Sequence, residues 1–91
     1  MYKQITTIIN PTGIHARPAS DFVSMAKTFS SDIQIKALST DDKPANAKSI
    51  LRVLSLGLSK GTNVEISAEG EDEEKAVNSL VELITSGFGE A

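Results

Sequence analysis

The sequence predicts an α+β protein in which an antiparallel sheet carries helices on one face. Alternating apolar and polar residues indicate strands at residues 33–37 and 64–68. Apolar residues spaced three or four apart indicate helices from residue 16 to 29 and from residue 71 to near 87. The predicted order is strand, helix, strand, short strand, short helix, strand, helix (βαββαβα). We expect one domain over residues 1–91, because this length supports a single core.

The first half of the chain supplies a strand, a helix and a second strand. Residues 2–9 are rich in Ile and Thr and are followed by Asn10 and Pro11, which predicts a strand that stops there. A helix is predicted from Ala16 to Phe29, ended by two serines at residues 30–31. Its expected buried stripe is Ala19, Phe22, Val23, Ala26 and Phe29. The next strand turns Ile33, Ile35 and Ala37 to the core.

The second half begins with an acidic, turn-rich segment at residues 38–44, whose Asp41–Asp42 pair is typical of a solvated turn. Residues 45–47 follow a proline and predict only a short edge strand. Ser49 is expected to cap a short helix, and residues 64–68 form the last strand. Acidic residues at 71–74 favour a helix start, and the buried stripe of that helix is Ala76, Val77, Leu80, Val81 and Ile84.

Composition excludes several classes of protein. The chain is 40% hydrophobic and 23% charged, which is typical of soluble globular domains. It has no cysteine and one histidine, so neither a disulfide nor a His/Cys zinc cluster is available, and no metal or other cofactor is expected. A net charge of -3 argues against general nucleic-acid binding. No signal peptide or apolar run of bilayer length is present, so we expect a cytoplasmic protein.

The charges are distributed unevenly along the chain. Eight of the 12 acidic residues follow residue 64, whereas Arg17, Lys27, Lys48 and Arg52 precede it. Two interpretations stay open. The asymmetry leaves a positive face near the histidine for an acidic partner, or the charges merely solvate the surface.

The candidate site is the segment from Pro11 to Ser20, which holds the only histidine. Gly13 permits a turn and Pro18 suits the first turn of a helix, so His15 is expected at a helix N-terminus. Free amides there attract anions, and the Arg17 guanidinium suits phosphate. This arrangement indicates phosphoryl chemistry. The alternative on local grounds is a histidine that only lies on the surface or caps the helix.

Three segments carry a resemblance to a known family. Residues 13–19 (GIHARPA) resemble the active-site signature of HPr, the histidine-containing phosphocarrier family of the bacterial phosphoenolpyruvate-dependent sugar phosphotransferase system. Residues 48–57 (KSILRVLSLG) look like the regulatory-serine segment of that family, and residues 68–73 (AEGEDE) resemble its entry to the last helix. These segments follow the family's order and span nearly the whole chain.

The resemblance implies a fold and a reaction. The fold is an open-faced β-sandwich, a four-stranded antiparallel sheet covered on one face by three helices. His15 would accept a phosphoryl group from the phosphohistidine of enzyme I and pass it to enzyme IIA or IIB components. The amides of Ala16 and Arg17, with the Arg17 guanidinium, would stabilise the phosphate. In the family the phosphorylated nitrogen is Nδ1.

The resemblance also implies regulation and docking by the second helix. Ser49 corresponds to a site for the ATP-dependent HPr kinase/phosphorylase, and the serine-phosphorylated form binds a catabolite-control transcription regulator in the family. Ile50, Leu51 and Leu54 correspond to partner-binding positions. Leu51 and Leu54 replace methionines common in Gram-positive members, and Arg52 stands where many of them carry glycine. The protein is expected to act as a monomer.

Two functions other than a phosphocarrier are compatible with parts of the sequence. An acylphosphatase-like hydrolase would use Arg17 to hold phosphate, but the chain lacks the Arg and Asn pair arranged as that family needs. A purely regulatory paralogue of HPr, signalling through Ser49 in nitrogen or catabolite control, would not transfer phosphate. The presence of His15 argues against this second alternative.

Overall fold

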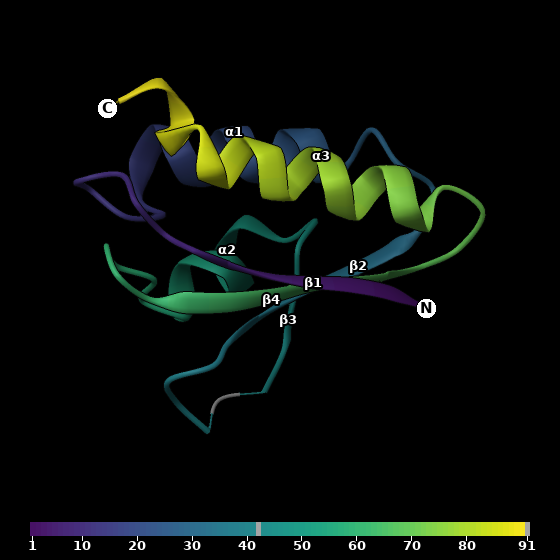
Figure 1. Cartoon of the computed structure of the whole chain (residues 1–91), viewed down its shortest axis with the longest axis horizontal. Coiled ribbons are helices and arrows are strands. Elements are labelled where there is room, and N and C mark those ends of the chain that lie inside the picture. Colours follow the sequence, from purple (N-terminus) through teal and green to yellow (C-terminus); the bar gives the residue numbers. More distant parts are fainter. Residues whose placement is uncertain (42, 91) are drawn as a thin grey trace.

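The computed structural model describes residues 1–41 and 43–90; Asp42 of the predicted acidic turn and Ala91 lie outside the described residues. One antiparallel sheet has the strand order β1-β4-β2-β3, and the helices cover one face of it (Figure 1). The elements are β1 (Tyr2–Thr7), α1 (Ala16–Ala26), β2 (Asp32–Ala37), β3 (Ala45–Asn46), α2 (Ile50–Ser55), β4 (Asn63–Glu69), α3 (Glu73–Thr85) and a short 3-10 turn, η1 (Gly87–Gly89). The predicted fold class and element order are confirmed.

β4 is a central strand with a neighbour along each side. Ile66 of β4 pairs with Gln4 of β1 and with Ile35 of β2. The alternation predicted for β4 holds, because Val64, Ile66 and Ala68 are buried while the intervening residues are more exposed. β3 lies at the far edge beside β2 and has two residues, as expected after Pro44.

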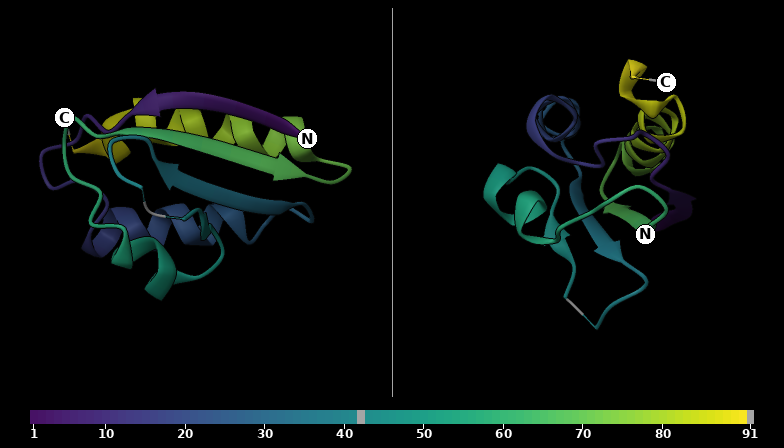
Figure 2. Two further views of the ribbon diagram at one scale, coloured as in Figure 1. Left: turned by 90° about the horizontal axis from the view of Figure 1, so that it is seen from below. Right: turned by 90° about the vertical axis from the view of Figure 1, so that its left-hand side faces the viewer.

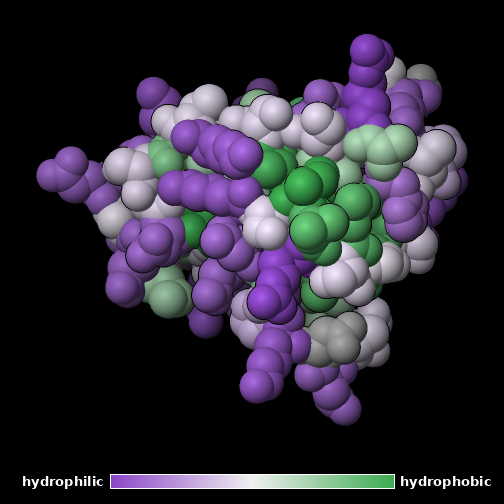
Figure 3. Space-filling model, turned by 180° about the vertical axis from the view of Figure 1, so that it is seen from behind, coloured by the Kyte–Doolittle hydropathy of each residue, from purple (hydrophilic) through white to green (hydrophobic). Residues whose placement is uncertain are grey.

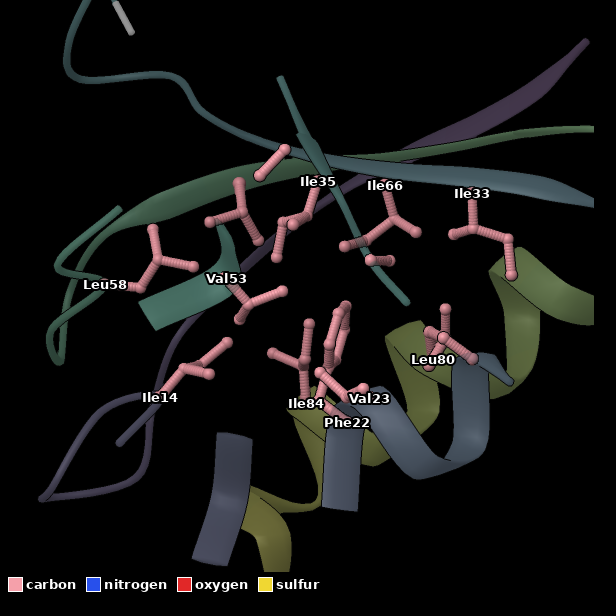
Figure 4. Packing of buried hydrophobic residues seen from close by; sticks show 14 of the residues in the cluster. Ile14, Phe22, Val23, Ile33, Ile35, Val53, Leu58, Ile66, Leu80 and Ile84 are labelled. Carbon is pink, nitrogen blue, oxygen red and sulfur yellow. The ribbon is translucent and has the colours of Figure 1, made fainter. Parts of the chain in front are cut away.

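The core lies between the sheet and the helices (Figure 4). α1 and α3 contact each other, and Figure 2 shows both on the same side of the sheet. Phe22 of α1 and Leu80 and Ile84 of α3 are fully buried there, and Val53 is the one residue of α2 that is fully buried. The opposite face of the sheet carries exposed and half-buried polar side chains, including Lys3, Gln34, Lys36, Glu65 and Ser67. In the described part of the chain, no helix has the length and apolarity to cross a membrane.

Several boundaries differ from the sequence predictions. β1 ends at Thr7 and not at Ile9, and β3 ends at Asn46 and not at Ala47. α1 ends at Ala26, not at Phe29, because Thr28 and Phe29 donate to carbonyls three residues back in a turn. Phe29 is consequently half-buried at the rim of the core, as is Val81. α3 begins at Glu73, so Glu71 precedes it, and the chain after Ser86 forms η1, which the periodicity did not predict.

Asp72 ties the turn after α1 to the start of α3. Its carboxylate accepts hydrogen bonds from the backbone N–H of Ser30 at 2.9 Å, from the backbone N–H of Ser31 at 3.0 Å and from the Ser31 hydroxyl. These bonds, led by the Ser31 hydroxyl, lower the pKa of Asp72 to about 2. The carboxylate is therefore charged in the folded protein at every pH above that value.

We expect Asp72 to make folding stability sensitive to acid. Its pKa is about 2 in the folded state and about 3.9 in an unfolded chain, so its contribution is complete above pH 4 and is lost as the pH falls towards 2. The free energy of unfolding of Asp72→Asn, measured by urea denaturation, should therefore lie below that of the wild type at pH 7. This deficit should shrink between pH 4 and pH 2. Asp21→Asn, at an exposed position of α1, is the control. A deficit that stays constant with pH would contradict the role of the charge.

Candidate functional site

His15 stands at the N-terminus of α1 with its side chain exposed. It is the N-cap residue, with an extended backbone (φ -132°, ψ 162°), yet its imidazole makes no capping hydrogen bond to the helix. The local alternative of a capping histidine is therefore wrong. The amides of Ala16 and Arg17 precede the first intrahelical hydrogen bonds, and α1 has no acidic residue in its first turn. The ring and these amides therefore lie together at a helix N-terminus, a position that favours negative charge.

The backbone beside the imidazole is strained. Ala16 has a φ of 48°, in the left-handed region, which costs a residue with a side chain about 1–2 kcal/mol. Ile14 and Pro18 on either side are both buried, so packing holds the chain in this conformation. Because Ile14 and Pro18 are buried and Ala16 is held in a strained conformation, the His15 side chain points towards solvent. The sequence did not predict this strain.

The loop before His15 lies against the connection between α2 and β4. The Ile14 N–H donates to the Leu58 carbonyl at 2.9 Å, and both side chains belong to the core. Gly13 has a φ of +70°, as its predicted turn requires, and its Cα faces the backbone of Leu58 and Ser59. A side chain at position 13 would meet that backbone.

Arg17 and α2 complete the surface around the histidine. The Arg17 side chain is exposed and forms no ion pair with the described residues. α2 packs against α1, with Ile50, Leu51 and Leu54 exposed by 39%, 77% and 37%. We call these three residues the apolar patch. Figure 3 shows hydrophobic side chains gathered in one area of this side of the molecule, with hydrophilic ones around it.

Ser49 caps α2 as predicted. Its Oγ accepts a hydrogen bond from the Arg52 backbone N–H at 3.4 Å, and the residue is half-buried. The neighbouring Lys48 ammonium donates to the Phe29 carbonyl at 2.8 Å, which joins α2 to the turn after α1. The Arg52 side chain is exposed.

A polar network that no sequence pattern predicted joins Glu90 to the loop before His15. The Glu90 carboxylate accepts from Asn10 Nδ2 at 3.0 Å and from the Thr12 hydroxyl at 2.8 Å. The partners lie 78 and 80 residues apart in the chain, and no local pattern connects them. The one available signal was a polar residue, Asn10, at the end of an apolar strand.

The site is a surface and not a pocket. One broad groove follows the acidic face of α3 and another lies between α1 and α3; His15 lines neither of them. Small-molecule sites are usually concave, so this arrangement suits chemistry on a bound protein better than hydrolysis of a small acyl phosphate. Among the described residues, no group of three His, Cys, Asp or Glu side chains is placed to hold a metal ion.

Comparison with known proteins agrees with this geometry. The family model described as "PTS HPr component phosphorylation site" matches residues 2–86. The phosphocarrier protein HPr of Lysinibacillus sphaericus is 46% identical over 85 residues, which are 93% of each chain. The crystal structure of HPr from Thermoanaerobacter tengcongensis superposes with a TM-score of 0.93 at 50% identity, covering 100% of this chain and 99% of that one. Crh, a Bacillus subtilis catabolite repression protein crystallised as a domain-swapped dimer, has a TM-score of 0.72 at 39% identity, covering 96% and 97%.

Gly13→Ala should destabilise the protein more than Gly57→Ala. Both residues have a positive φ, which costs alanine about 1–2 kcal/mol. A Cβ at position 57 has no atom within 4 Å, whereas one at position 13 would clash with the Leu58 carbonyl and lie 2.9 Å from Ser59 Cα. We expect a further loss of about 1–3 kcal/mol for Gly13→Ala, measured by chemical denaturation. Equal losses for the two variants would show that the approach to Leu58 is not a constraint.

Proposed function

Because the chain belongs to the HPr family, and is therefore a phosphocarrier of the phosphotransferase system, we propose that His15 is the residue that carries the phosphoryl group. It accepts the group from the phosphohistidine of enzyme I and passes it to a histidine or cysteine of enzyme IIA or IIB components. The observation that supports this assignment most directly is the exposed imidazole of His15 beside free helix amides and Arg17.

The proposed chemistry is an in-line exchange of one phosphorus bond for another. A lone pair of the neutral His15 imidazole attacks phosphorus as the P–N bond of the donor breaks, and the donor nitrogen keeps that electron pair. The amides of Ala16 and Arg17 and the Arg17 guanidinium hold the charged oxygens, first in the transition state and then on phosphorylated His15. Transfer to the acceptor repeats the same step in reverse. Exposure of the ring allows two partners to use it in turn.

We further propose that partners dock on the apolar patch beside His15. Ile50, Leu51 and Leu54 offer exposed apolar area on α2, which packs against α1. Arg52 lies among them in α2, and Arg17 is exposed in the first turn of α1. An apolar centre with a charged rim is the usual anatomy of a transient interface. Acidic rims on enzyme I and the enzyme II components would complement it.

We also infer that the protein works in the cytoplasm as a monomer. Its four strands and three helices close one core within a single chain, so no second copy is needed to bury it. The domain-swapped dimer described for Crh belongs to that protein. A purely regulatory role is less well supported than transfer, because the chain has His15 in an exposed position.

Ser49 is proposed as a regulatory phosphorylation site for HPr kinase/phosphorylase. Its hydroxyl is at the N-terminus of α2 and directly precedes Ile50 of the apolar patch. A phosphate there remains compatible with the helix end and adds about -1.5 to -2 charges beside the docking surface. It would weaken docking of enzyme I and favour a different partner, a catabolite-control transcription regulator.

His15→Ala tests the main proposal. Incubation with phosphoenolpyruvate and enzyme I should add one acid-labile phosphate to the wild type, detected by intact mass measurement, and none to His15→Ala. The free energy of unfolding should change by no more than about 0.5 kcal/mol, because the side chain is exposed. Ser49→Ala, which keeps the histidine, should label as the wild type does. Acid-labile phosphate on His15→Ala would exclude His15 as the carrier.

Ser49→Asp and Ser49→Ala test the regulatory proposal. In transfer assays from enzyme I, Ser49→Asp should raise the KM for this protein several-fold at low salt, whereas Ser49→Ala should not. The difference should diminish at about 1 M salt, where the Debye length is about 3 Å. Equal KM values for both variants at low salt would contradict the charge mechanism. Failure of HPr kinase to label the wild type would exclude the site itself.

A further inference from the structure

The Glu90 side chain joins the end of the described chain to the loop that precedes His15. Glu90 follows η1, where Gly87 is buried and Phe88 packs against the core. From this anchored position its carboxylate reaches the turn at residues 10–13, accepting from Asn10 Nδ2 at 3.0 Å and from Thr12 Oγ1 at 2.8 and 3.0 Å. The loop is thereby held by a segment outside the site.

The hydrogen bonds of Asn10 show that the Glu90 contact helps to fix the Asn10 side chain. Asn10 is completely buried, and its amide nitrogen donates to the Gly13 carbonyl at 2.7 Å, to Glu90 at 3.0 Å and, at 3.4 Å, to Thr12 Oγ1. Its Oδ1 is buried without a partner among the described residues, which is costly. The two nearest acceptors of this amide, the Gly13 carbonyl and the Glu90 carboxylate, therefore fix its orientation.

The contact is charged and adds to the other restraints on the loop. Hydrogen bonds from Asn10 and then Thr12 lower the pKa of Glu90, so the carboxylate stays ionised at neutral pH and its hydrogen bonds are charge-assisted. The Ile14 N–H of the same loop donates to the Leu58 carbonyl. Glu90 and Leu58 thus both hold the loop, and the strained Ala16 follows directly after His15.

We propose that Glu90 is a positioning residue for phosphoryl transfer, acting on His15 through Asn10 and Thr12. This inference rests on the proposed role of His15. The carboxylate keeps the loop ordered before a partner docks. The entropy cost of ordering the loop therefore does not reduce the free energy of binding. Glu90 is itself exposed, so its loss should affect the loop far more than the global stability.

Glu90→Ala is the first test, with Glu82→Ala, an exposed glutamate of α3, as the matched control. In Glu90→Ala the amide hydrogens of Gly13 and Ile14 should exchange with solvent about three- to tenfold faster, as expected for the loss of one or two hydrogen bonds. Amides of β4 should not change. The rate of transfer from phospho-enzyme I to His15 should fall by a similar factor, while Glu82→Ala matches the wild type in both measurements.

Glu90→Gln and Thr12→Val separate positioning from simple destabilisation. Glutamine keeps an acceptor for Asn10 and Thr12 and should restore part of the transfer rate. The Thr12→Val effect should be non-additive with Glu90→Ala, because the Thr12 hydroxyl donates to the Glu90 carboxylate and both variants remove that contact. Wild-type transfer by Glu90→Ala would overturn the proposal, as would slower transfer with unchanged exchange at Gly13 and Ile14. Absence of labelling in the wild type would instead reject the role of His15.

Discussion

The main-chain hydrogen bonds between residues 8–14 and 58–62 are the constraint on which the site depends. The Ile8 N–H donates to Thr62, the Gly61 N–H to Ile8 and the Ile14 N–H to Leu58, at 2.9, 2.7 and 2.9 Å. They place the loop before α1 beside the connection that follows α2. His15 and the apolar patch therefore belong to one end of the molecule, although Ile50 comes 35 positions after His15 in the sequence. Without a glycine at position 13 the two segments could not approach so closely.

The residues that form the core differ from the exposed residues that we propose to act in phosphoryl transfer. The sheet and the stripes of α1 and α3 supply the buried area, and Val53 fixes α2 to it. The groups assigned to function, His15, Arg17 and the apolar patch, contribute little to the core and remain exposed. A carrier that meets successive partners needs this separation, because docking must not disturb packing. The strained Ala16 links the two parts.

Local patterns predicted the elements well, and contacts between distant residues account for what they missed. Alternation in β2 and β4 and the stripe of α1 were readable because burial imposes their periods. The end of α1 at Ala26 depends on a turn tied to Asp72, 46 residues further on. His15 at a helix start was predictable from Gly13 and Pro18. Its strained neighbour and the Glu90 contact were not, because both arise from tertiary packing.

The position of Met1 has a practical consequence for labelling this protein. β1 runs from one end of the sheet to the other, so Met1 lies at the opposite end from the His15 loop (Figure 1). The amino group pairs with Glu73 at 3.3 Å, a surface ion pair whose loss costs little. A fluorophore or affinity tag joined to Met1 would stand clear of the His15 loop. One attached beyond Glu90 would instead emerge next to the loop that carries the histidine.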